Sequence, residues 1–267
     1  MRCRTTVVLL FLSIGAAAQT LTSQSRPVRD SQGLSLLRQS VTAMSNGGSV
    51  SDITLTGTAT RIAGSDQQSG QLVLKAKGTL ESKIALSLSG YTFSEVRNYV
   101  NGSGAGSYVG PDGILHVTAQ QNCFIDPAWF SPMLSSLASA VSSPGINVSY
   151  LGTATLNGSA VQHVATWQSI SSPDSSAALA IAHLSTMDWY LDASTSLPIA
   201  VRFTTHPADD ASKDFAVEVR FSAYQPTNGV LIPFHVQKFL NGGLVLDLTI
   251  SSAVLNSGLS DSDFTLQ

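Results

Sequence analysis

The sequence predicts a mainly β fold in which one long antiparallel sheet is accompanied by a few helices. Apolar and polar residues alternate over most of the chain after residue 50, which is the period of strands with one buried face. Asn-Gly pairs at 157–158, 228–229 and 241–242 separate such runs and favour two-residue hairpin turns. Only 12% of the residues are charged, which favours strands and tight turns over salt-bridged helices.

Residues 1–18 are predicted to be a signal peptide. Arg2 and Arg4 precede an apolar run over 7–12, and small residues at 16–18 follow, so cleavage is expected after Ala18. The apolar run is shorter than the ~20 residues that span a bilayer. We therefore expect a periplasmic or secreted protein whose mature chain has no transmembrane segment.

The rest of the chain is predicted to be a single β-domain over residues 30–267, because no compositional break marks a linker. Residues 19–29 are polar and are expected to form a flexible mature N-terminus. We expect a monomer. Cys123 would be the only thiol after cleavage, so an internal disulfide is excluded. Its apolar neighbours predict a buried and unreactive side chain.

A helix is predicted first in this domain. Positions 34, 37, 41 and 44 are apolar and recur at helical spacing. Asp30 or Ser31 can cap its N-terminus, and Asn46-Gly47-Gly48 ends it. A single apolar stripe means that this helix lies on the sheet.

Four alternating runs between residues 50 and 100 then predict a meander. The glycine-rich segment 101–107 is interpreted as a turn, and Asp112-Gly113 as the next hairpin. Two helices are predicted to follow. One spans 131–141, with Ser131-Pro132 at its start, and one spans 173–184, beginning at Ser172-Pro173.

The chain after residue 187 predicts strands almost exclusively. Apolar residues occupy every second position of 215–221, 230–236 and 244–250. Pro233 cannot donate a backbone hydrogen bond, so its strand is expected at an edge of the sheet or with a bulge at this point.

Motifs for catalysis or metal binding are not found. The five histidines (His116, His163, His183, His206 and His235) lack the spacing of zinc ligands. The 206–210 segment comes nearest to a metal cluster and is interpreted as a polar hairpin tip. A net charge of −3 with few basic residues argues against nucleic acid. We therefore predict no catalytic residue, no metal ligand and no cofactor.

Three segments in the last third of the chain resemble the periplasmic lipoprotein carriers of the LolA/LppX type. They read YLDASTSLP (190–198), FSAYQPTNGVLIPF (221–234) and NSGLSDSDF (256–264). The resemblance implies an antiparallel, unclosed half β-barrel of about ten or eleven strands, with helices covering its concave face. It also implies an apolar cavity that holds acyl chains or another hydrophobic ligand.

We therefore expect a soluble protein that binds a lipid or acyl chain as a carrier or sensor and is not an enzyme. Alternation places six apolar side chains on one face of the last strands, where we expect them to line the cavity: Phe221, Val230, Ile232, Phe234, Leu246 and Leu248. One alternative is an envelope protein-interaction module that uses an exposed edge such as the strand of Pro233. Another is a hydrolase whose residues are distant in sequence, which requires a cleft that joins a His to a Ser or Asp.

Overall fold

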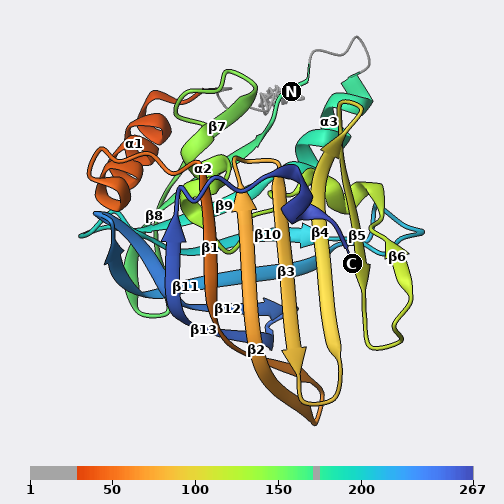
Figure 1. Ribbon diagram of the computed structural model, residues 1–267. Helices are drawn as coiled ribbons and strands as arrows, with labels where there is room; N and C mark the ends of the chain where they lie inside the picture. The colour runs from red at the N-terminus through yellow and green to blue at the C-terminus, as the bar shows by residue number, and fades with distance from the viewer. Residues whose placement is uncertain (1–28, 171–174, 267) are drawn as a thin grey trace, which may run out of the picture.

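The computed structural model describes residues 29–170 and 175–266, whose strands form one open antiparallel sheet (Figure 1). The strand order is β6-β5-β4-β3-β2-β1-β13-β12-β11-β10-β9-β8-β7, so β1 pairs with β13 and every other pair is adjacent in sequence. The two edges, β6 and β7, are consecutive along the chain. Within the described residues these two edge strands do not pair with each other, so the sheet stays open, which confirms the predicted unclosed half-barrel.

The bounds of the elements are as follows. The strands are β1 (Asp52–Ala63), β2 (Asp66–Lys77), β3 (Glu81–Leu88), β4 (Thr92–Val100), β5 (Ser103–Val109), β6 (Leu115–Val117), β7 (Ile146–Leu156), β8 (Ser159–Gln168), β9 (Met187–Asp192), β10 (Pro198–Thr205), β11 (Phe215–Thr227), β12 (Val230–Leu240) and β13 (Gly243–Leu255). The helices are α1 (Ser31–Ser45), α2 (Ser136–Ser139) and α3 (Ser175–Ser185), with the 3-10 helices η1 (Gln120–Phe124), η2 (Pro132–Leu134) and η3 (Asp261–Phe264).

Helix α1 forms as its sequence predicts. The Asp30 carboxylate accepts a hydrogen bond from the amide of Gln32 at 2.8 Å, and Asn46 ends the helix in the left-handed conformation. Leu37 and Met44 are fully buried. A Cβ at Gly33 would lie 2.9 Å from Val148, so this glycine allows the helix to pack closely on β7.

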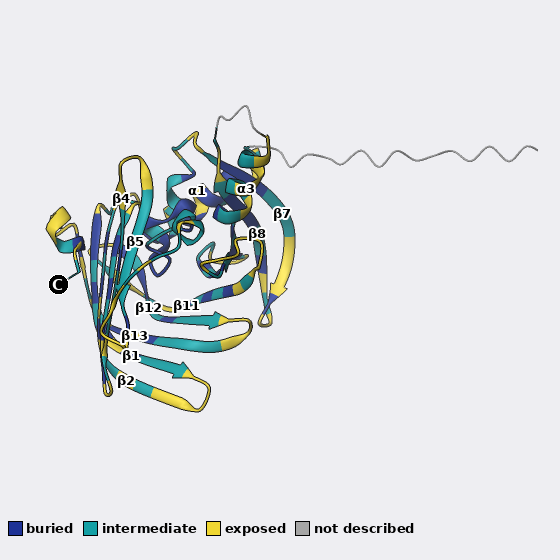
Figure 2. Cartoon of the chain, turned by 90° about the vertical axis from the view of Figure 1, so that its right-hand side faces the viewer, coloured by how far each residue is buried: buried dark blue, intermediate teal, exposed yellow. Residues whose placement is uncertain are grey.

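The concave side of the sheet is covered by α1, α2, η1 and η2, around which the sheet curls (Figure 2). The helix predicted over 131–141 is interrupted, because Ser135 has an extended backbone between η2 and α2. The guanidinium of Arg29 donates to the carbonyls of Ala140, Ser143 and Ile146 at 2.6–3.0 Å. These contacts join the end of α2 to the connection that follows it and to the start of β7. The predicted start of the third helix, at Ser172-Pro173, lies outside the described residues.

The sheet has thirteen strands within the described residues, more than the expected ten or eleven. Part of the difference is the segment 101–107, which is only a turn at Asn101-Gly102 and continues as β5. A Cβ at Gly104 would lie 2.7 Å from the carbonyl oxygen of Cys123. Gly104 therefore permits η1 to approach the strand closely, and it lies in a strand and not in a loop.

The motifs that resemble the carrier family have clear structural roles. Asp192 accepts hydrogen bonds from the amides of Ser194 and Thr195, which forms the β9–β10 turn. The hydroxyl of Tyr224 donates to the carbonyl of Pro198 at 2.7 Å. At the end of the chain, η3 packs on the convex face, where Phe264 is buried and Asp263 pairs with Lys75 at 2.7 Å.

Pro233 is not on an edge strand, contrary to one sequence expectation. Strand β12 lies between β11 and β13, and Pro233 pairs with Tyr224 of β11. The register of β12 with β13 begins only at His235 opposite Thr249. Pro233 therefore lies beyond that ladder, where its missing amide hydrogen removes no bond to β13.

Cys123 is half-buried in η1 and is not a core residue as predicted. Its thiol contacts the carbonyl of Ala119 at 3.7 Å. Partial burial raises the pKa of the Cys123 thiol, so the thiolate is disfavoured. The low reactivity of this thiol stays a prediction, because the side chain is only partly enclosed.

Candidate functional site: a charged, largely apolar cavity

A cavity of about 560 Å³ lies between the concave face of the sheet and the segment around η1. We call it the concave cavity. Its size is within the range of small-molecule sites, roughly 300–1,000 Å³. Its walls are mainly apolar and come from distant parts of the chain: Ile84, Leu86, Phe93, Trp129, Phe203 and Leu246.

Lys238 of β12 brings a positive charge into this apolar setting. It pairs with Val219 and Leu246 in the sheet, so its side chain points to the concave face. Its ammonium lies 4.4 Å from the centre of the Trp129 ring. Desolvation lowers the pKa of Lys238, an effect that the nearby Glu95 charge opposes. Within 29–170 and 175–266, no carboxylate is within ion-pair distance of this ammonium.

Asp126 is the second unusual charge at the cavity. Its carboxylate accepts a hydrogen bond from the amide of Ser136 at 2.7 Å and so caps the start of α2. Desolvation raises the pKa of Asp126 to about 6, although these hydrogen bonds work in the opposite direction. Glu95 and Arg97 also line the cavity and form an ion pair at 3.5 Å. The mainly apolar lining of the cavity therefore also contains charged groups.

The six residues predicted to line the cavity occupy different environments. Leu246 lines it. Phe234 is partly buried and packs against the main core. The other four are core side chains with 0–3% exposure: Phe221, Val230, Ile232 and Leu248. Their contact with a ligand stays a prediction.

Lys238 and Asp126 were missed by sequence reasoning. For Lys238 a signal exists, because the inward-facing alternation of 230, 232, 234 and 236 continues to this lysine. A charged residue at an inward-facing position of a strand, after a series of apolar ones, indicates that the apolar core is interrupted there. For Asp126 no local pattern exists, since its burial depends on segments far away in sequence.

A hydrogen-bonded chain of Ser222, His235 and Asp247 crosses the convex face. The Ser222 hydroxyl is 3.1 Å from Nδ1 of His235, and Nε2 of His235 is 2.8 Å from Asp247. This order of groups is that of a hydrolase triad. However, Ser222 is exposed on the face opposite the concave cavity, which none of the three residues lines. Because a nucleophile requires an adjoining substrate site, we interpret the chain as a set of surface hydrogen bonds.

Solved structures match the arrangement of strands and helices, whereas no protein-family model and no curated protein matches the sequence. A LolA superfamily protein from Nitrosomonas europaea is 12% identical, with a TM-score of 0.51 over 88% of this chain and 97% of that one. A domain named for outer membrane lipoprotein sorting, from Vibrio parahaemolyticus, is 14% identical, with a TM-score of 0.53 over 87% and 96%.

This chain has the fold of the LolA superfamily. A DUF1329 family protein from Desulfovibrio piger also shares it, at 10% identity and a TM-score of 0.55 over 90% of this chain and 98% of that one. The fold expectation drawn from the three sequence motifs is therefore confirmed. At these identities the likeness concerns the LolA-like fold, and function must be argued from the cavity itself.

Proposed function

We propose that this LolA-like protein binds an amphiphilic hydrophobic ligand in the periplasm or outside the cell, as a carrier or sensor. The apolar chain of the ligand occupies the concave cavity, and an anionic headgroup contacts Lys238. The observation that carries the proposal is a desolvated ammonium, with no ion-pair partner among the described residues, in the wall of a mainly apolar cavity. An anionic group beside the Lys238 ammonium would replace the favourable interaction with water that the ammonium loses on burial.

Physical considerations support a binding role. Each methylene transferred into such a cavity contributes roughly 0.8 kcal/mol, so a medium-length acyl chain supplies enough free energy for binding without a reactive group. The predicted signal peptide favours an extracytoplasmic location. Among the described residues, no helix is both long enough and apolar enough to cross a membrane.

The proposal is tested with Lys238→Met, which keeps the length of the side chain and removes its charge. We expect the variant to bind a fluorescent fatty-acid probe roughly 10-fold or more weakly, as the loss of a buried charge-assisted contact implies. A neutral probe of the same chain length should bind equally to both proteins. Lys213→Met is the matched control, because Lys213 also lies over an aromatic ring, that of Phe215, but is exposed.

If both probes bind Lys238→Met as they bind the unmodified protein, the headgroup assignment is wrong. If no probe binds the unmodified protein, and organic extracts of protein purified from its native compartment contain no amphiphile, the carrier function is wrong as well.

A protein-interaction module is the second candidate, supported by one observation on the β6 edge. Leu115 and Val117 of this short edge strand expose 63% and 83% of their surface, and Ile114, which directly precedes it, exposes 59%. Apolar side chains on an open edge favour addition of a partner strand. The candidate binding edge is therefore β6 and not the strand of Pro233, which lies in the interior of the sheet. Absence of any amphiphile together with a fully folded protein would favour this function.

A further inference from the structure

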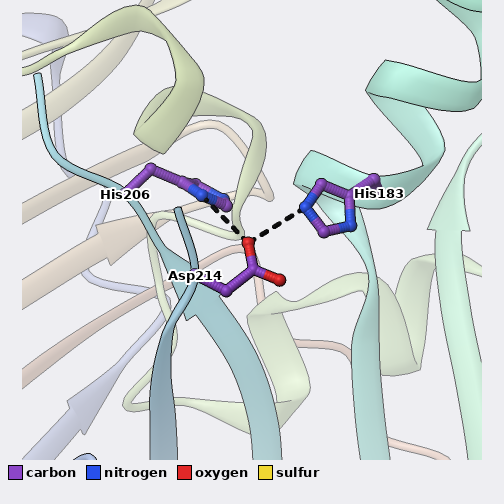
Figure 3. Close-up of side chains that lie close together, drawn as sticks. All are labelled: His183, His206 and Asp214. Carbon is purple, nitrogen blue, oxygen red and sulfur yellow. Dashed lines mark hydrogen bonds and ion pairs between the residues drawn. The ribbon is translucent and has the colours of Figure 1, made fainter. Parts of the chain in front are cut away.

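Two histidines and an aspartate that are distant in sequence converge at one point of the fold (Figure 3). His183 is in the last turn of α3, His206 follows β10, and Asp214 precedes β11. Oδ1 of Asp214 is 3.0 Å from Nε2 of His183 and 3.3 Å from Nδ1 of His206. All three ligand atoms lie within 4.8 Å of one another. We call these three residues the His-His-Asp cluster.

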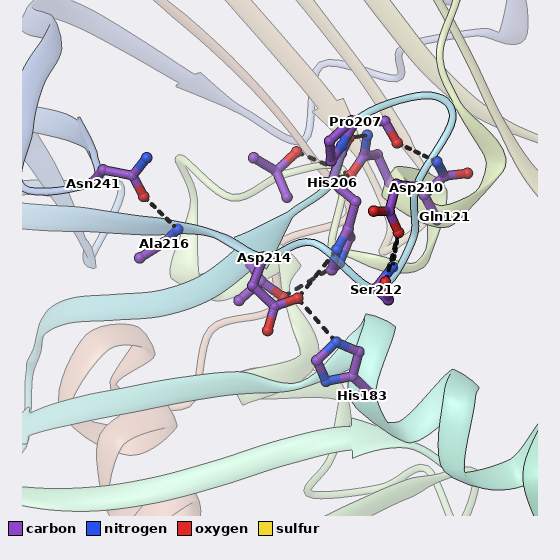
Figure 4. Close-up of polar contacts among 12 residues, drawn as sticks. Gln121, His183, His206, Pro207, Asp210, Ser212, Asp214, Ala216 and Asn241 are labelled. Carbon is purple, nitrogen blue, oxygen red and sulfur yellow. Dashed lines mark hydrogen bonds and ion pairs between the residues drawn. The ribbon is translucent and has the colours of Figure 1, made fainter.

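Side chains of the 3-10 helix η1 form hydrogen bonds with the backbone of His206 and of the residues that follow it (Figure 4). The side-chain carbonyl of Asn122 accepts from the amide of His206 at 2.8 Å, and its amide group donates to the carbonyl of His206 at 2.8 Å. Gln121 donates to the carbonyls of Pro207 and Ala208. The position of His206 is therefore set by contacts independent of its imidazole.

The other two members are anchored as well. Near Asp214, the first strand residues of β11 are clamped by Asn241, whose side chain accepts from the amide of Ala216 at 3.0 Å (Figure 4). At the end of α3, the hydroxyl of Ser185 accepts from the amide of Gln168 at 2.9 Å, which ties the helix to β8. Three separate elements thus present one donor atom each to a common point, as a preorganised site requires.

The imidazole of His206 is the observation that distinguishes this cluster from a surface ion pair. Its side chain is fully buried, and its Nδ1 makes no hydrogen bond although it faces Asp214. Its Nε2 is 3.4 Å from the hydroxyl of Thr204. A proton on Nε2 would leave a buried lone pair on Nδ1 that is directed into the cluster. A buried nitrogen without a partner costs free energy, which a metal ion at this point would recover.

We propose that the His-His-Asp cluster binds a divalent transition metal, with Zn²⁺ as the ion that its donors fit. Imidazole nitrogens and a carboxylate oxygen are ordinary zinc ligands, at about 2.0–2.2 Å from the metal. In a tetrahedral site such bonds separate ligand atoms by about 3.4 Å. The two measured separations, 3.0 and 3.3 Å, are close to that value. The third separation, between the nitrogens of the two imidazoles, is at most 4.8 Å, and the exposed side chain of His183 can move to shorten it.

A fourth position is available from an adjoining pocket of about 610 Å³, which His183 and Asp214 line together with Glu218 and Arg220. Water from this pocket would complete the coordination. Because the ligands come from α3 and from both ends of the β10–β11 connection, the bound ion would fasten that helix to the sheet. Metal binding should then stabilise the folded protein, since the unfolded chain has no such site.

The experiment is a titration of the metal-free mature protein, purified with a tag that contains no histidine, with Co²⁺ and Zn²⁺. We expect one Co²⁺ per chain with the visible absorption of tetrahedral coordination, its displacement by Zn²⁺, and a Tm that rises with Zn²⁺ concentration. His183→Ala and Asp214→Asn change exposed side chains and should fold normally by circular dichroism. Each should lose the absorption band and bind Zn²⁺ roughly 100-fold or more weakly.

His116→Ala is the matched control, because His116 forms a comparable exposed pair with Asp112 at 2.7 Å but has no third ligand in the part of the chain that the structure describes. It should bind both metals as the unmodified protein does. If the unmodified protein shows no stoichiometric Co²⁺ band, or if His183→Ala retains the band and the Zn²⁺ affinity, the cluster is an ion pair only and the proposal is wrong. This outcome is independent of amphiphile binding, which uses the concave cavity.

Discussion

The carboxyl group of Asp126 should make the stability of this protein depend on pH in the opposite direction from most acidic residues. Its pKa rises from 3.8 to about 6 in the folded state because the carboxylate is desolvated beside the concave cavity. Between these values the folded state binds one proton more than the unfolded state, so the free energy of unfolding falls as pH rises. The contribution of Asp126 to the free energy of unfolding is fully present below about pH 4 and is lost as the pH rises through about 6.

The magnitude follows from the same pKa change. A difference of about two pKa units corresponds to about 3 kcal/mol. Solvent in the adjoining cavity screens part of the charge, so we expect a cost of about 1–3 kcal/mol at neutral pH. Asp126→Asn removes the charge and retains an oxygen that can accept from the amide of Ser136. The variant should therefore equal the unmodified protein in stability near pH 4 and exceed it by about 1–3 kcal/mol near pH 7.5.

The assay is urea unfolding of both proteins at a series of pH values, with the difference between them as the readout. Asp192→Asn provides a control of opposite sign. Hydrogen bonds from Ser194 and Thr195 lower the pKa of Asp192 to about 2. Its stabilisation is therefore present above the unfolded pKa and is lost as pH falls, so Asp192→Asn should be less stable at neutral pH. A difference for Asp126→Asn that stays constant from pH 4 to 7.5 would refute the reasoning.

Two further variants test the cavity and the glycine-rich strand. Leu246 and Leu248 lie two residues apart on the same face of β13, but only Leu246 lines the cavity, whereas Leu248 is fully buried. Leu248→Ala should lower the free energy of unfolding in urea by about 2–5 kcal/mol, and Leu246→Ala should lower it by less. Leu246→Ala should also weaken binding of the fatty-acid probe. Equal losses of stability in the two variants would contradict the assignment of Leu246 to the cavity wall. Gly104→Ala should cost about 1–3 kcal/mol, because its Cβ would lie 2.7 Å from the Cys123 carbonyl. Gly243→Ala, whose Cβ would make an ordinary 3.5 Å contact, is the control, and an equal loss there would remove the packing explanation.

The sequence alone determined the elements whose causes are local. Asp30 and Asn46 delimit α1 because caps act on the nearest free amides and carbonyls. Asn228-Gly229 and Asn241-Gly242 turn the chain because both residues of each pair adopt positive φ. Alternation correctly predicted which side chains of β11 and β12 share a face, since the period of two is a property of the strand itself. In β13 it is correct for Leu246 and Leu248 but wrong for Leu244, because a bulge places Leu244 opposite Phe239 and so on the other face.

Only the tertiary structure decided what lies over those faces. Leu246 and Leu248 have the same pattern in sequence, yet one borders a cavity and the other is enclosed, because the difference arises from the segment around η1. The His-His-Asp cluster likewise depends on α3 and the β10–β11 connection meeting in space. Periodicity sets the direction of a side chain, but its burial, pKa and partners depend on residues brought close by packing, which no local pattern encodes.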